Sequence, residues 1–234
     1  MKRDSACVLL VRVRSIALGA LAFALAACGG TPAVVATSSP TQTPTATPVA
    51  ATNAGAWTVS DRSKATVSVR EQLVGVNLPS DALLVTSGGT GSFTLNADGT
   101  FSPDSKISFD LTTLVSDNRD RDNFIRQDTL QVRQFPKAEF VPTKATGLAL
   151  PLATSGELTF KIAGQMTIHG TTKEVTFDVK ATRTGADLVA TATANPTWKF
   201  SDFGMRMPSV PFRVVSVNDE IRLVVSLVAT GPNT

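Results

Sequence analysis

Residues 158–168 read LTFKIAGQMTI and carry the clearest strand pattern in the chain. Apolar side chains occupy every second position, and polar or small side chains stand between them. A period of two residues is typical of a β-strand with one buried face. The length suits a tilted barrel strand, and Gly164 allows a bend. The stretch therefore predicts a long barrel strand with one face turned inward.

The same period recurs along the chain from Trp57 onward. After turn residues at His169-Gly170, apolar residues alternate again over 175–181. Short connections with turn residues such as Asp98-Gly99 indicate antiparallel hairpins. We therefore predict an all-β fold, an antiparallel barrel of about eight strands, which is wide enough to hold one small ligand. Further strands are expected within residues 66–70, 92–96, 107–112, 137–141, 188–192 and 221–229.

Two segments interrupt this pattern. Residues 71–91 alternate poorly and are predicted to form a long loop or a short helix with a glycine-rich exit. Residues 200–211 carry Phe203, Met205 and Met207 at alternate positions, which predicts a rim loop or an edge strand. Long loops at the mouth of a barrel often determine specificity.

Residues 117–140, DNRDRDNFIRQDTLQVRQFPKAEF, form the most charged stretch of the chain. Asp117 or Asn118 can cap a helix, and Asp120 lies in the first turn, where the helix dipole favours a carboxylate. Pro136 ends any helix. We predict a short helix that closes one end of the barrel as a lid, with its apolar side chains turned inward.

The aspartates of this stretch, Asp117 to Asp128, also suit a general acid–base pair or a cation site. Caps and surface ion pairs are the simpler interpretation, because no candidate nucleophile or glycine-bearing calcium loop accompanies them. The single histidine, His169, stands beside a turn glycine. No nucleophile elbow or phosphate-binding motif is present in the sequence. We therefore predict a binding protein with no catalytic residue, metal or cofactor.

The N-terminus has the features of an export signal. Four basic residues within 1–14 precede an apolar run at 16–27, and the run ends in LAAC, which resembles the bacterial lipobox. We predict a lipoprotein signal peptide at 1–27, then lipidated Cys28 with a disordered Thr/Pro/Ala-rich linker to residue 55, and a barrel domain at 56–231. The mature protein would be exported and attached through its lipid to the outer face of a bacterial membrane.

Charge and cysteine content exclude other classes. The chain holds 22 basic and 19 acidic residues, but residues 1–27 contain four of the former and one of the latter, so the remainder is neutral. A neutral domain gives no reason to expect a nucleic-acid partner. The only cysteines are Cys7 and Cys28, so no disulfide stabilises the mature domain.

Three motifs, in the same order, resemble those of the YceI-like, lipocalin-like family of secreted bacterial proteins. Residues 117–140 are similar to the family signature DxxRDxHLRSxDFFDVxKYPxxxF. GQMTIHGTTKEVTFDV (164–179) resembles its central hairpin, and SDFGM (201–205) resembles its DFGM segment. The sequence departs from the family pattern at Asn123, where many members have His, and at 129–131, which replace FFD.

The resemblance implies an antiparallel barrel around an elongated apolar cavity, and a polyisoprenoid lipid or isoprenoid quinone as ligand. The apolar side chains expected to line that cavity come from several strands and from the charged stretch. They are Phe93, Phe109, Phe124, Ile125, Phe135, Phe140, Phe160, Met166, Phe177, Phe203 and Met205. Plain core packing is the alternative for each of them, because alternation identifies an inward face but not a hollow one.

Three functions are compatible with these observations. We favour a membrane-anchored binding protein that sequesters or transports an isoprenoid lipid or quinone. The first alternative is a lipid-acting hydrolase or isomerase that uses the aspartates. The second is a ligand-free structural or stress-related envelope protein. The sequence leaves open whether the domain forms a homodimer.

Overall fold

The computed structural model describes residues 55–209 and 213–232. The predicted signal peptide, Cys28 and most of the predicted linker lie outside these residues, so those features stay predictions. The described strands are β1 (Gly55–Val59), β2 (Lys64–Leu73), β3 (Ser80–Ser87), β4 (Thr90–Leu95), β5 (Lys106–Asp110), β6 (Lys137–Thr146), β7 (Ser155–Ile168), β8 (Thr171–Thr184), β9 (Asp187–Ala194) and β10 (Val214–Thr230). Short helical segments are η1 (Leu111–Thr113), α1 (Arg119–Phe124), η2 (Ile125–Thr129) and η3 (Phe200–Phe203).

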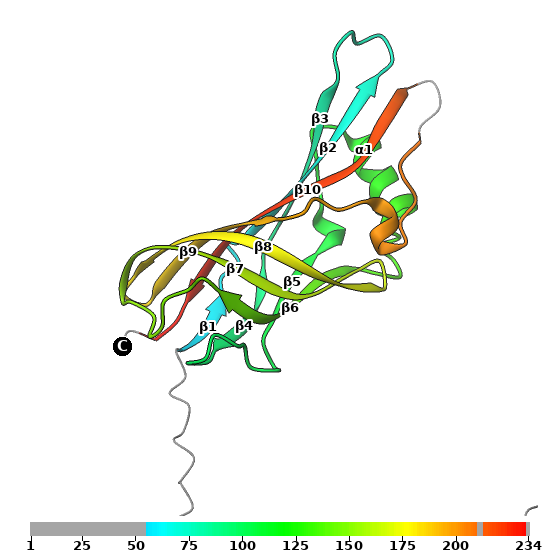
Figure 1. Ribbon diagram of the computed structural model, residues 1–234. Helices are drawn as coiled ribbons and strands as arrows, with labels where there is room; N and C mark the ends of the chain where they lie inside the picture. The colour runs from blue at the N-terminus through cyan, green and yellow to red at the C-terminus, as the bar shows by residue number, and fades with distance from the viewer. Residues whose placement is uncertain (1–54, 210–212, 233–234) are drawn as a thin grey trace, which may run out of the picture. The chain divides into compact units, whose positions relative to one another are not determined.

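All strand pairs are antiparallel, and the pairing of β1 with β10 closes the sheet. The closed order is β1-β4-β5-β6-β7-β8-β9-β10, and β2 and β3 continue from β10 as a further pair. β2 and β1 lie one after the other along the long strand β10, with a turn between them. β3 and β4 are likewise separated only by Gly88 and Gly89. When β2 and β1 are counted as one kinked strand, and β3 and β4 as another, the barrel has eight strands. This confirms the predicted barrel (Figure 1).

The β7–β8 hairpin confirms the prediction made from residues 158–168. Its register runs without interruption from Ser155↔Thr184 to Ile168↔Thr171. His169 and Gly170 make the turn, with φ of 50° and 71°, the left-handed region that two-residue hairpin turns require. Alternate residues of β8 from 175 to 183 are buried, and their neighbours face outward.

Residues 71–91 correct the sequence prediction, because they form strands rather than a loop or a helix. β2 continues to Leu73 and β3 begins at Ser80, so only the hairpin tip between them is irregular. The alternation is obscured in the sequence for a physical reason. Glu71 places a carboxylate on the inner face, while Leu83, which is 53% exposed, places an apolar side chain on the outer one. Figure 1 shows this hairpin projecting beyond the rest of the barrel.

The predicted short helix is present at α1. Asn118 is its N-cap, and its side-chain oxygen accepts hydrogen bonds from the backbone N–H groups of Asp120 and Arg121 at 2.9 and 3.1 Å. The helix continues into η2 and ends at Thr129. Gln131 follows with a positive φ of 48°, so the chain turns before it reaches Pro136.

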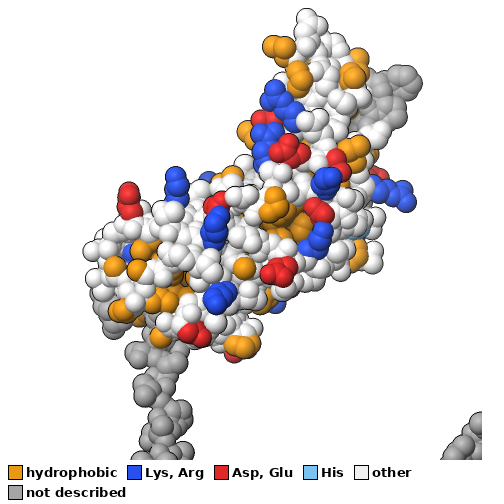
Figure 2. All heavy atoms as spheres, in the orientation of Figure 1, with side chains coloured by type: hydrophobic (Ala, Val, Ile, Leu, Met, Phe, Trp, Pro, Cys, Tyr) orange, Lys and Arg blue, Asp and Glu red, His pale blue; other side chains and the backbone are white. Residues whose placement is uncertain are grey.

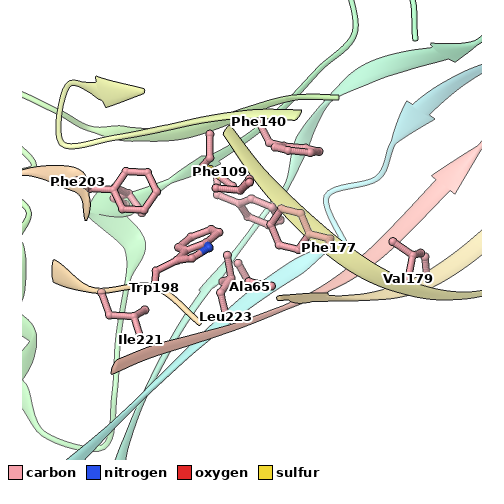
Figure 3. Close-up of a cluster of buried hydrophobic side chains, with 14 of the residues drawn as sticks. Ala65, Phe109, Phe140, Phe177, Val179, Trp198, Phe203, Ile221 and Leu223 are labelled. Atoms are coloured by element: carbon pink, nitrogen blue, oxygen red, sulfur yellow. The ribbon is translucent and has the colours of Figure 1, made fainter. Parts of the chain in front are cut away.

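Part of the segment predicted as a rim loop or an edge strand folds as the 3₁₀ helix η3, and residues 204–209 lack regular structure. A row of aromatic rings attaches η3 to the barrel wall (Figure 3). Ring centroids lie 5.2 Å apart for Phe140 and Phe177, 5.9 Å for Phe177 and Trp198, and 5.1 Å for Trp198 and Phe203. These edge-on and tilted contacts are the arrangements that aromatic pairs favour.

Candidate functional site

The inside of the barrel is hollow. A cavity of about 850 Å³ runs through it, and most of the residues that line it are apolar. The inward residues of β2, from Ala65 to Leu73, all line this cavity at alternate positions. Eight residue steps at a rise of about 3.3 Å correspond to roughly 26 Å. The cavity is therefore long and narrow, a shape that suits an extended hydrocarbon chain.

The end of the cavity at β1 is closed by Trp57 and a buried arginine. Trp57 is 1% exposed, and Arg183 of β8 places its guanidinium 5.1 Å from the centre of the Trp57 ring. The same guanidinium donates hydrogen bonds to four backbone carbonyls, those of Leu152, Ala153, Gly185 and Pro232. Arg183 thus ties three segments of chain together over the ring.

The other end of the cavity is polar. All four charged residues that line the cavity belong to two ion pairs there. Arg121 Nη2 donates to Glu71 Oε1 at 2.6 Å, and Arg213 Nη1 donates to Asp120 Oδ2 at 3.0 Å. The first pair is largely buried, with 19% and 9% of the two side chains exposed. The second pair is open to solvent. The cavity is therefore amphipathic along its length, apolar at Trp57 and charged at α1.

Three of the four aspartates of the charged stretch are engaged in structural contacts, and the fourth, Asp128, is exposed. Asp122 is buried and accepts hydrogen bonds from the backbone N–H and the hydroxyl of Ser116, both at 2.7 Å. Asp117 pairs with Arg121, and Asp120 pairs with Arg213. Within residues 55–209 and 213–232, no group of three or more His, Cys, Asp or Glu side chains is placed to hold a metal ion.

Nine of the eleven side chains predicted to contact a ligand line the cavity. They are Phe93, Phe109, Phe124, Ile125, Phe140, Phe160, Met166, Phe177 and Met205. Phe124 belongs to α1 and Ile125 begins η2, so the charged stretch lines the polar end of the cavity. Contact of these nine with a ligand stays a prediction.

The other two predicted side chains, Phe135 and Phe203, are not part of the lining. Phe135 was assigned an inward position by helical spacing, but the helical segment ends at Thr129, and its ring packs instead on His169 at 4.8 Å. Phe203 is 1% exposed and packs on Trp198. Trp198 itself lines the cavity, and Phe203 supports it as part of the surrounding core.

Sequence reasoning missed Glu71, Arg183 and Trp198. A signal for the first two was present in the sequence, because each continues the inward positions of its strand at a spacing of two. A charged residue in register with a buried face marks a site where the fold must supply partners. Trp198 gave no such signal, since it lies outside the named strands and joins the wall through a single bridge to Ile221.

The outer surface carries interspersed basic and acidic side chains, and apolar side chains gather at the tip of the β2–β3 hairpin (Figure 2). Val74, Val76 and Leu78 at this tip are 53%, 46% and 74% exposed. Val74 and Val76 also line the polar end of the cavity, so the tip borders its mouth. In the described part of the chain, no helix is both long and apolar enough for a membrane span.

A closed antiparallel sheet around one elongated apolar cavity defines a lipocalin-like barrel. Within that class, residues 57–229 match the model of the YceI-like domain, and the chain belongs to this family. A UPF0312 protein of Pseudomonas putida strain W619 is 34% identical over 134 residues, which cover 52% of this chain. The matched region spans 66% of that relative's length, just under two thirds. A UPF0312 protein of Pseudomonas fluorescens strain SBW25 is also 34% identical over 134 residues, with the same coverage.

Solved structures share the fold at low sequence identity. BcnA of Burkholderia cenocepacia has a TM-score of 0.53 and 18% identity, covering 72% of this chain and 96% of its own. A polyisoprenoid binding domain from Saccharophagus degradans, implicated in plant cell wall breakdown, has a TM-score of 0.55 and 10% identity, covering 75% and 98%. These similarities establish the barrel architecture.

Proposed function

We propose that this protein binds an isoprenoid lipid or isoprenoid quinone, with the chain inside the barrel and the headgroup at the polar end. The observation that carries the proposal is the cavity itself: about 850 Å³, elongated, apolar at its closed end and charged only at the other. A hydrocarbon chain gains about 0.8 kcal/mol for each CH₂ group that it buries. The polyisoprenoid binding domain of Saccharophagus degradans, which has the same fold, supports this choice of ligand.

Binding rather than catalysis is the proposed role. Three of the four aspartates that an enzyme would use are held by Ser116, Arg121 and Arg213. The binding role, the predicted signal peptide and the predicted lipid on Cys28 together describe an exported, membrane-tethered protein that sequesters or transports its ligand. The tether would keep the barrel near the bilayer where isoprenoid lipids reside.

The direct test is to purify the protein from its native host, extract it with organic solvent and analyse the extract by mass spectrometry. The proposal predicts an isoprenoid in an amount stoichiometric with the protein. A barrel that carries no lipid and also fails to take up an added isoprenoid alcohol or quinone would refute it. Cys28→Ser tests the tether separately: the variant should leave the membrane fraction, and its retention there would contradict lipidation.

A further inference from the structure

The charged end of the cavity contains equal numbers of opposite charges. Glu71 and Asp120 are the carboxylates that line it, and Arg121 and Arg213 are the guanidinium groups. Each cation is already bonded to one of these carboxylates. Arg121 also pairs with Asp117, so two carboxylates offset its single charge. The cavity-lining residues therefore offer a headgroup no net positive charge.

Three backbone N–H donors in the first turn of α1 are engaged as well. Protein sites for phosphate usually combine unpaired Arg or Lys side chains with free N–H groups at a helix N-terminus. In α1 the side chain of Asn118 accepts from the N–H groups of Asp120 and Arg121, and the backbone oxygen of Asn118 accepts from the N–H of Asp122. A phosphate, with a charge of about −1.5 to −2 at pH 7, would have to displace Glu71 or Asp120 to obtain a cation whose charge is not already offset.

From this charge balance we infer that the cavity selects isoprenoids with an uncharged oxygen headgroup, an alcohol or a quinone carbonyl, and rejects phosphorylated ones. The inference rests on the proposed function and adds the headgroup class. An uncharged oxygen can accept from a guanidinium N–H without breaking either ion pair, and a hydroxyl can also donate to a carboxylate. A phosphate at the same place meets the repulsion of Glu71 in a largely buried setting, where charges are poorly screened.

Two ligands with one chain and different headgroups test this inference: geranylgeraniol and geranylgeranyl phosphate. The protein is the full chain carrying Cys28→Ser, so that no acyl group is attached. Its two tryptophans, Trp57 and Trp198, both line the cavity and report binding by fluorescence. We expect the alcohol to bind at least about tenfold more tightly than the phosphate. Glu71→Gln removes one negative charge. It should lower the ratio of the phosphate Kd to the alcohol Kd by about fivefold or more.

Glu174→Gln, at an exposed position of β8, is the matched control and should leave the ratio unchanged. If Glu71→Gln fails to fold, Asp120→Asn makes the same change of charge at an exposed side chain and should narrow the ratio in the same direction. Phosphate binding equal to or tighter than alcohol binding overturns the headgroup inference alone. A ratio that neither Glu71→Gln nor Asp120→Asn alters also overturns it. Failure of both ligands to bind overturns the proposed function together with it.

Discussion

Two inward-facing charged residues, Glu71 and Arg183, distinguish the two ends of the cavity. Glu71 continues the buried positions of β2 and meets Arg121 at the polar end. Arg183 continues those of β8, where it donates hydrogen bonds to backbone carbonyls and places its guanidinium over the Trp57 ring. A buried charge is stable only with such partners. The same strand periodicity thus supplies a polar mouth at one end and a closure at the other.

Arg183 is predicted to be a main source of stability at the closed end. Arg183→Met keeps much of the side-chain volume but leaves four backbone carbonyls without their donor. We expect the free energy of unfolding to fall by about 3 kcal/mol, measured by urea denaturation. Arg133→Met, at an exposed position, should change it by less than about 0.5 kcal/mol. Equal effects of the two substitutions would contradict this account of the closure.

Asp202 is predicted to make stability depend on acid pH. Its carboxylate accepts hydrogen bonds from Lys173 Nζ at 2.6 Å and from the backbone N–H of Lys199 at 2.8 Å, and these contacts lower its pKa below the ordinary value of 3.8. The contribution to stability is therefore present above pH 3.8 and is lost as the pH falls through the lower pKa of the folded state.

The measurement is the thermal midpoint as a function of pH for the wild type and Asp202→Asn. Below about pH 4, where the Asp202 carboxylate becomes protonated, the thermal midpoint of the wild type should fall more steeply with pH than that of Asp202→Asn. The exposed residue Asp104 provides the control, as Asp104→Asn. If the thermal midpoints of the wild type and Asp202→Asn fall equally with pH below about pH 4, this carboxylate does not stabilise η3.

Among the elements, β7 was predicted best because its inward and outward sides differ in polarity along its whole length. β2 was predicted only in part and β3 was missed, since Glu71 and Leu83 reverse that difference in polarity. The N-cap of α1 could be narrowed to two residues from the sequence, and Asn118 proved to be the cap. The end of the helical segment could not be predicted, because it depends on the left-handed conformation of Gln131.

Gly164 of β7 is predicted to be required for the close packing of β6 on β7. A Cβ at this position would lie 2.5 Å from the carbonyl oxygen of Val141 and 2.6 Å from the ring of Phe140. Gly164→Ala should therefore lower the free energy of unfolding by about 1 to 3 kcal/mol, which thermal or urea unfolding would measure. Ala163→Ser adds one atom at the neighbouring position and serves as the control. A fully stable Gly164→Ala variant would contradict this packing.

For the whole molecule, the sequence predicted the barrel class, its strand number and most of the inward-facing aromatic side chains. Strand alternation could not show that the interior is hollow, because it is the same for a filled and an open barrel, and only the family resemblance implied a cavity. It also could not show that Glu71, Asp120, Arg121 and Arg213 meet, because they come from three separate segments of the chain. The cavity is a property of the closed sheet and not of any single strand.

If the hollow interior holds one isoprenoid chain, a bulky side chain placed inside it should prevent lipid binding. Ala190 of β9 lines the cavity, while its neighbour Val189 faces outward and is 55% exposed. Lipid uptake is measured by adding geranylgeraniol to the full chain carrying Cys28→Ser and recording native mass spectra. The unblocked protein and Val189→Phe should each bind one lipid molecule per barrel, and Ala190→Phe should bind none while its thermal midpoint shows that it remains folded. Undiminished uptake by Ala190→Phe, or no uptake by the unblocked protein, would contradict the account.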